Sequence, residues 1–234
     1  MPMNRAASVA IAKYRSELLL ASLVAAMLAS PLIDHHPRIG GAVALLQLLL
    51  LLAGAYYLAD RKILRRVVLP IGLVWLFARL LEAFGNPRHS YCHLAPLAGL
   101  ALSCAILWGL LRRFRSIARV TSSIISEAII CYLLIAVAFS QLYWVFDHFV
   151  TNAFNQSIFL GQSSTFLYFS MITLSGVAYG GILPVNSYIR LIAAFENVVG
   201  LFYLAVVIAR LVSSYRPKPH PSDLHSEQPA EPPH

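Results

Sequence analysis

Charged residues are scarce in this sequence, and that scarcity is the first guide to its class. Asp, Glu, Lys and Arg make up 12% of the 234 residues, whereas hydrophobic residues make up 59%. Soluble domains carry about 25% charged residues, so the composition excludes an ordinary soluble domain. Several windows instead reach the roughly 18 or more apolar residues that a bilayer span needs. The chain is therefore predicted to be an all-α integral membrane protein.

Cysteine is equally sparse, and three cysteines do not make a disulfide framework. Cys92 falls in a predicted outer loop, Cys104 in mid-span and Cys131 in the inner half of a span. No two of them meet on the oxidising side, so we expect no intrachain disulfide. The outer stretch RHSYCH also holds His89 and His93, but no fourth ligand is tied to it by sequence. We therefore favour solvated histidines there over a metal site.

Six apolar segments are predicted to span the membrane: 17–33, 39–59, 67–84, 94–111, 124–146 and 189–213. Basic clusters precede the first span, separate the second from the third and the fourth from the fifth, and follow the sixth. The positive-inside rule then makes both termini cytoplasmic and puts 147–188 on the outer side. One alternative stays open: the first span is a cleaved signal sequence ending at MLAS, which leaves five spans.

Basic residues outnumber acidic ones by 18 to 10, but they lie in short clusters at the ends of apolar runs. That placement suits membrane orientation, so nucleic acid is not an expected partner. The fourth span contains no basic residue, whereas a voltage sensor needs arginines at every third position, so we expect weak or no voltage gating. Four arginines follow this span and either anchor it or attract anionic lipid at the inner leaflet: Arg112, Arg113, Arg115 and Arg119.

Non-helical backbone is predicted between the fifth and sixth spans. The stretch TLSGVAYGGILP (173–184) holds glycines and a proline, which cost about 1 and 3 kcal/mol respectively inside a helix. The overlapping SSTFLYFSMITLS (163–175) is too short to cross a bilayer but long enough for a half-helix, and its serines suit a helix start. Irregular backbone at membrane depth survives only when it is packed in protein or lines a wet cavity. A descending half-helix followed by a returning extended strand predicts a re-entrant loop.

The geometry of such a loop predicts cation binding. A half-helix that ends in mid-membrane turns the negative end of its dipole toward the pore axis. Backbone carbonyls of the returning strand can replace the water shell of an ion. Glycines let successive carbonyls point the same way. Because one chain supplies one loop, a ring of four subunits is implied.

The stretch YFSMITLSGVAYGGILP (168–184) resembles the pore-helix and filter signature of potassium channels, which reads close to YFSxVTLTTxGYGDIxP. The segment 190–212 is similar to the inner helix of that family and has Gly200 at the usual position of the gating hinge. The resemblance implies a bacterial-type, six-span homotetramer in the plasma (bacterial inner) membrane. It also implies that potassium is the permeant ion and that no cofactor is needed. The matching residues are Tyr168, Phe169, Ser170, Thr173, Leu174, Tyr179, Gly180, Ile182 and Pro184.

The resemblance also implies a domain organisation. A cytoplasmic N-terminus (1–16) and a four-helix peripheral region (17–122) precede a pore domain (123–213), and a disordered cytoplasmic tail (214–234) follows. The pore domain is expected to consist of an outer helix 124–146, a pore helix 163–175, a filter 176–181 and an inner helix 189–213. The expected ion-coordinating residues are Ser175, Gly176, Val177, Ala178, Tyr179 and Gly180, and the expected filter supports are Thr173, Gly181 and Glu196.

Three residues depart from the family pattern. Gly176 stands in place of a threonine whose hydroxyl is an ion ligand at the innermost site. Ala178 replaces the first glycine of GYG, where a Cβ costs roughly 1–2 kcal/mol if the backbone needs a positive φ. Gly181 replaces an aspartate that braces the filter from behind. Cation conduction is compatible with these changes, but strict potassium selectivity does not follow from them.

Charged residues at two further places in the spans are expected to have structural roles. Arg79 and Glu82 lie three residues apart on one face of the third span, and we expect them to pair with each other. Glu196 lies one turn before Gly200 in the sixth span, and we expect it to be a structural partner behind the filter.

These observations lead to a hypothesis and its alternatives. The first is a homotetrameric cation channel that passes ions, preferably potassium, through backbone carbonyls of the filter. A non-selective cation channel of the same architecture and a non-conducting pore-like scaffold are the alternatives. A six-span transporter is disfavoured because the sequence shows no inverted repeat with paired broken helices. An enzyme is not expected, because no cluster of His, Cys, Asp or Glu converges within the spans.

Overall fold

The computed structural model describes residues 5–35, 64–84, 94–115, 122–150, 152–155, 163–177 and 179–214. Throughout these ranges the secondary structure is helical apart from short connections, and the one β-type pairing within them is an isolated bridge between Phe154 and Pro184. The elements are α1 (Arg5–His35), a π-helical turn η1 (Leu64–Val68) that runs into α4 (Leu69–Phe84), α5 (Leu94–Arg115), α6 (Ser122–Phe149), α7 (Ser163–Ser175) and α8 (Ser187–Ser214).

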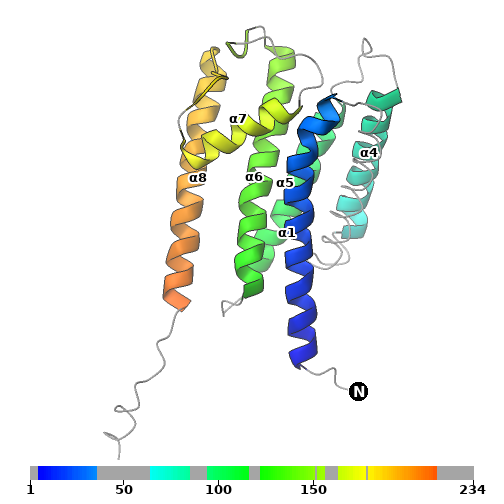
Figure 1. The fold of residues 1–234 in the computed structure, drawn as a ribbon, viewed down its shortest axis with the longest axis vertical. Coiled ribbons are helices and arrows are strands. Elements are labelled where there is room, and N and C mark those ends of the chain that lie inside the picture. The colour runs from blue at the N-terminus through cyan, green and yellow to red at the C-terminus, as the bar shows by residue number, and fades with distance from the viewer. Residues whose placement is uncertain are drawn as a thin grey trace, which may run out of the picture.

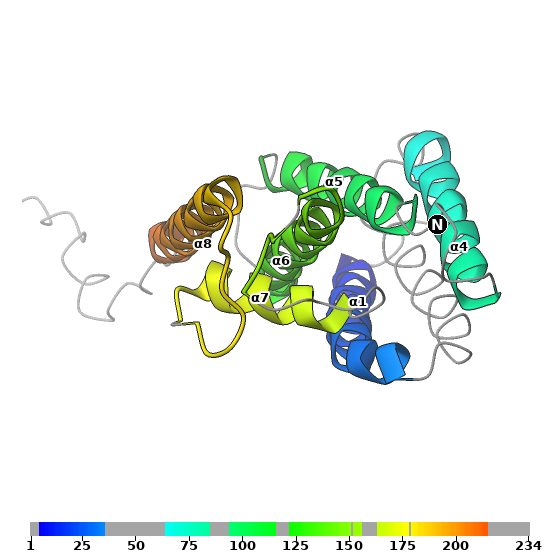
Figure 2. The ribbon, with the colours of Figure 1, turned by 90° about the horizontal axis from the view of Figure 1, so that it is seen from above.

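The long helices run roughly side by side, and the short helix α7 lies across the space between α6 and α8 near one end of the bundle (Figure 1). Seen from above, α6 lies between α8 and the pair formed by α1 and α5, and α4 lies farthest from α8 (Figure 2). The contacts agree with this order, because α6 touches α1, α5, α7 and α8, whereas α4 packs on α5. Helix α6 is therefore the centre of the molecule.

Three described helices are long and apolar enough to cross a membrane: Leu94–Arg112, Ile125–Phe149 and Ser187–Arg210. The apolar part of α1, Ser16–Leu32, is shorter. Helix α1 begins at Arg5 rather than near residue 17, since the preceding stretch RAASVAIAKYR contains neither glycine nor proline and is free to continue the helix. The predicted second span (39–59) and the predicted tail, from residue 215 on, lie outside the described residues.

Aromatic packing is concentrated around α7. Tyr143 of α6 meets the ring of Phe169 edge to face, with centroids 4.8 Å apart at 79°, and Trp144 stacks on Phe166 at 6.3 Å. Edge-to-face and offset stacked pairs are the arrangements that aromatic rings prefer. A second cluster of buried side chains joins α1, α5 and α6, and includes Leu19, Leu23, Leu110, Ile130, Cys131 and Leu134. The first cluster fixes α7 against α6, and the second fixes α1 in the bundle.

Candidate functional site

Helix α7 begins near the C-terminal end of α1 and ends against the middle of α8, after which the chain returns to the start of α8 (Figure 1). The returning segment is held by residues 153–155. Asn155 Oδ1 accepts a hydrogen bond from the Leu183 amide at 2.8 Å, and its Nδ2 donates to the Gly181 carbonyl at 3.1 Å. The Val185 amide donates to the Ala153 carbonyl at 3.0 Å. These bonds tie the return path to the end of α6.

The C-terminal end of α7 is closed by a glycine cap. Gly176 has a φ of 72°, in the left-handed region. Its amide donates to the Thr173 carbonyl at 3.1 Å, and the Val177 amide donates to the Ile172 carbonyl at 3.1 Å. This pair of bonds is the Schellman motif, which ends helices on a left-handed glycine. The prediction that the backbone is extended from Gly176 onward is therefore wrong at this residue, because Gly176 completes the helix end.

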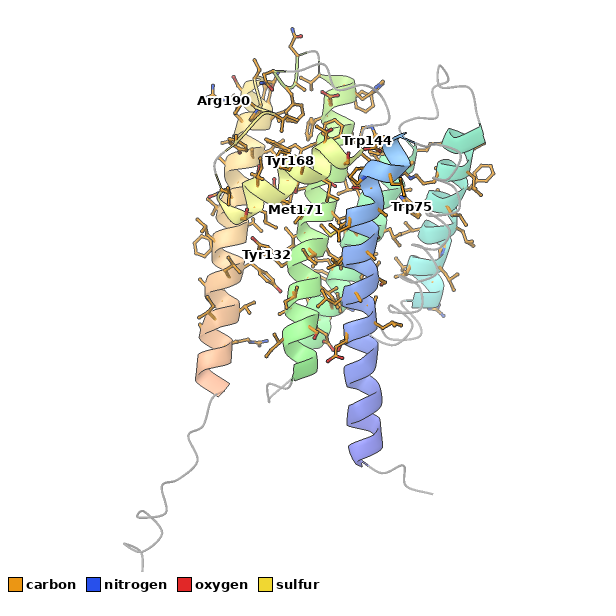
Figure 3. All side chains as sticks on the ribbon, viewed as in Figure 1. Trp75, Tyr132, Trp144, Tyr168, Met171 and Arg190 are labelled. Atoms are coloured by element: carbon orange, nitrogen blue, oxygen red, sulfur yellow. The ribbon has the colours of Figure 1, made fainter. Side chains whose placement is uncertain are left out.

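Residues of α6 and α8 cover the last carbonyls of α7. Asn197 Nδ2 donates to the Thr173 carbonyl at 2.9 Å, and the Tyr132 hydroxyl donates to the Leu174 carbonyl at 3.2 Å. Figure 3 shows Tyr132 below the end of α7. A Cβ on Gly200 would collide with the Leu174 carbonyl oxygen and lie 3.0 Å from its carbon. Helix α8 runs unbroken through Gly200, so the structure requires glycine there for close packing, and the hinge role stays a prediction.

A buried hydrogen-bond network joins α6, α7 and α8 at Glu196. The carboxylate of Glu196 is 0% exposed. It accepts hydrogen bonds from the Tyr143 hydroxyl at 2.6 Å and from the Ser170 hydroxyl at 2.5 Å. Ser170 Oγ also lies 2.8 Å from the Ala136 carbonyl of α6. Burial of a carboxylate is tolerated only with such partners, so Glu196 holds α7 against both long helices.

The side chain of Tyr179 turns back onto α7. Its ring stacks on Phe169, with centroids 5.3 Å apart at 13°. Its hydroxyl lies 3.3 Å from Thr173 Oγ1, which also lies 2.7 Å from the Phe169 carbonyl. A Cβ on Gly180 would lie 3.3 Å from the Tyr168 hydroxyl. Thr173 and Tyr179 thus link α7 to the returning segment through their side chains.

The structure brings most of the predicted site residues together at one end of α7. Ser175 is the last residue of the helix, and its hydroxyl bonds back to the Met171 carbonyl at 2.7 Å. Val177 and Gly180 lie in the returning segment, and both residues are exposed. Ala178 lies outside the described residues. Among the described residues of the predicted filter, Gly176 alone has a positive φ.

Several residues at the site were not found by sequence reasoning. The glycine cap could have been predicted from the sequence, because a glycine directly after a helical stretch marks a helix end. No local sequence pattern predicts the roles of Asn155, Asn197 and Tyr132, since each binds backbone that is distant in the sequence. The carboxylate of Asp34, from the end of α1, accepts hydrogen bonds from the first amides of α7, 129 and 130 residues away.

Arg79 lies beside two tryptophan rings, and its expected pairing with Glu82 stays a prediction. Its guanidinium carbon lies 6.0 Å from the ring centroid of Trp75 and 5.8 Å from that of Trp144. Figure 3 shows these two tryptophans on α4 and beside the start of α7. Cation–π contacts of this kind link the peripheral helix α4 to α6. The side chain of Glu82 lies outside the described residues, as do His89, Cys92 and His93.

The comparisons with known proteins agree with this geometry. Residues 125–216 match a family model described as "Ion channel". None of the curated proteins and none of the solved structures matches the chain. The matched residues begin in α6 and run through α7, the returning segment and α8. They point to ion transport across a membrane rather than to catalysis. The match covers less than half of the chain, and over residues 125–216 it supports the predicted resemblance to the potassium channel superfamily.

Proposed function

We propose that this chain is the subunit of a homotetrameric cation channel that prefers potassium. The proposal is carried by the position of α7, a 13-residue helix that ends against the middle of α8 and is followed by a glycine-rich return segment. Carbonyls in such a segment can replace the hydration shell of a cation. The permeant ion is the substrate, and its ligands are the backbone carbonyls of residues 176–180; the Ser175 hydroxyl bonds back to its own helix and is not among them.

The surface of α8 supports assembly around a central axis. In the single chain its large apolar side chains are mostly exposed, and Leu191 and Phe202 reach 71% and 68%. Apolar surface on this scale needs a cover of protein or lipid. One loop per chain cannot enclose an ion, whereas a closed ring of four copies encloses one and also covers part of α8. The mass of the purified assembly is expected to equal that of four chains.

A non-selective cation channel is the second candidate, and the helix cap favours it. Gly176 carries no hydroxyl to serve as the innermost ligand, and its left-handed backbone closes α7. Gly181 carries no carboxylate, and its carbonyl is instead held by the neutral amide of Asn155. A neutral brace allows the return segment more freedom than a charged one. Both features are compatible with conduction and weaken the case for strict selectivity.

The orientation and lipid contacts are part of the proposal. We propose six spans in a bacterial inner membrane, with both termini cytoplasmic. The positive-inside rule supports this topology, because the basic clusters then all lie on the cytoplasmic side. The guanidinium carbon of Arg112 lies 5.2 Å from the ring centroid of Trp108, a pairing suited to a membrane interface. Arg112, together with Arg113, Arg115 and Arg119, would attract anionic lipid at the inner leaflet.

The decisive measurement is the reversal potential of the purified protein in planar bilayers, with potassium on one side and sodium on the other. A shift toward the potassium equilibrium potential would support the selective channel. Current that reverses near zero would support the non-selective channel. Bilayers exposed to protein-free detergent provide the control. Absence of current under all lipids, pH values and voltages would overturn the channel and leave the non-conducting scaffold.

A further inference from the structure

The outer end of α7 is held by a residue from the other end of the chain. Asp34 Oδ1 accepts hydrogen bonds from the Ser163 amide at 3.2 Å and from the Ser163 hydroxyl at 3.0 Å. Asp34 Oδ2 accepts one from the Ser164 amide at 2.9 Å. The first amides of any helix lack partners within that helix. Asp34 therefore serves α7 as an N-terminal cap, although it belongs to α1.

The sequence of α7 leaves this role to α1. No acidic residue lies in the first turn of α7. The Ser163 hydroxyl donates its hydrogen to Asp34. A negative charge near a helix N-terminus is stabilising because it faces the positive end of the helix dipole. Asp34 thus supplies a charge that α7 does not carry itself.

The position of Asp34 in its own helix points the same way. It lies in the last turn of α1, where the negative end of the helix dipole disfavours a carboxylate. Its side chain is half-buried, and a buried charge is costly unless it is hydrogen-bonded. The three bonds to α7 resolve both problems. Local preference does not explain an aspartate at this place, whereas the contact with α7 does.

We infer that Asp34 is a positioning residue for the filter and that it makes α1 part of the support of the pore. Helix α7 has 13 residues and is therefore about 20 Å long, so a tilt at its start displaces the carbonyls at its far end. Helix α1 is able to hold the start still, because Leu19 and Leu23 are buried against α5 and α6. The part of the inference that concerns conduction rests on the proposed function.

The test combines two measurements on the full-length protein in lipid. Hydrogen–deuterium exchange reports how firmly the first turn of α7 is held, and the potassium–sodium reversal potential reports the filter. In D34A the amides of Ser163 and Ser164 should exchange about fivefold faster or more, and the reversal potential should move away from the wild-type value. D34N keeps one acceptor oxygen and should lie between wild type and D34A. This milder variant also serves if D34A does not fold.

Two further variants separate a positioning role from general weakening of α1. S30A removes a hydroxyl that, among the described residues, bonds to the Met27 carbonyl of the same helix, and it should behave as wild type in both measurements. D34A combined with S163D returns a carboxylate to the first turn of α7 without the link to α1. Exchange in this double variant should recover in part, whereas the reversal potential should stay shifted.

The outcomes against the inference are distinct from failure of the channel itself. Unchanged exchange in D34A overturns it, with or without current. Faster exchange with an unchanged reversal potential overturns the positioning role and leaves Asp34 as a cap. Full recovery of both readouts in the double variant shows that any local charge suffices, and overturns the role of α1. Absence of wild-type current overturns the proposed function, while exchange still decides whether Asp34 holds α7.

Discussion

The two ends of α7 are held by different chemistry from different parts of the chain. At the N-terminal end, the outer end in the proposed topology, a single carboxylate, Asp34 of α1, accepts the free amides. At the C-terminal end, the filter end of the proposed channel, neutral groups of α8 and α6, Asn197 and Tyr132, bind the last carbonyls, and Gly176 closes the helix. A fixed cation would also stabilise that end, but in the proposed channel it would repel the permeant cation. Neutral donors hold the filter end without this conflict.

The difference also predicts how tolerant each end is. The filter end depends on backbone shape and a very close helix approach, and neither adapts to added atoms. The outer end depends on one side chain with partial exposure. Changes at the filter end should therefore affect stability most.

The largest expected effect is at Gly200, where α8 meets the end of α7. By helix propensity alone, alanine should stabilise an interior helical glycine by about 1 kcal/mol. In G200A the new Cβ would collide with the Leu174 carbonyl oxygen, and we expect a loss of about 3 kcal/mol in the free energy of unfolding. Denaturation in detergent micelles measures the change. A205G, at an exposed position of the same helix, is the inverse control and should lose about 1 kcal/mol.

The next effect is expected at Glu196 of α8, which contacts the middle of α7. E196A leaves the buried Tyr143 hydroxyl without its carboxylate acceptor and should lower the free energy of unfolding by about 2 kcal/mol. E196Q keeps an acceptor oxygen and should lose about half as much. Equal losses in E196Q and E196A would mean that the charge, not the hydrogen bonds, stabilises this network.

A double-mutant cycle tests the glycine cap. G176T restores the residue typical of the family, but it places a Cβ at a positive φ and 3.2 Å from Asn197 Nδ2. We expect G176T to lose about 1–2 kcal/mol in unfolding free energy and N197A to lose about 1 kcal/mol. Because the two residues touch, the double variant should lose less than the sum, by about 0.5 kcal/mol. Strict additivity would show that Asn197 does not limit the space at Gly176.

The smallest effect is expected at Ser175. Its hydroxyl bonds back to carbonyls of its own helix, so S175A should change the free energy of unfolding by less than about 0.5 kcal/mol. The reversal potential should also stay at the wild-type value. A shifted reversal potential with unchanged stability would instead show that the Ser175 oxygen faces the ions, as the sequence pattern suggested.

Much of the helical framework was predictable from sequence. The expected pore helix 163–175 has the same bounds as α7, because its start has serines and its end has glycine. The inner helix, expected over 189–213, runs from Ser187 to Ser214. The conformation of Gly176 was not predicted, since the re-entrant loop was expected to return as extended backbone from this residue onward. The local helix-end rule gave the better guide at this position.

The sequence by itself determined the membrane class, the candidate spans and the place of the irregular loop, because apolar length and glycine content act locally. The tertiary structure alone decided how the loop is held. Asp34, Glu196 and Asn197 have partners 129, 26 and 24 residues away, and no local rule predicts such contacts. Only packing brings α1 and α8 to the two ends of α7, since backbone groups left free at helix ends accept any partner of suitable chemistry that the fold delivers.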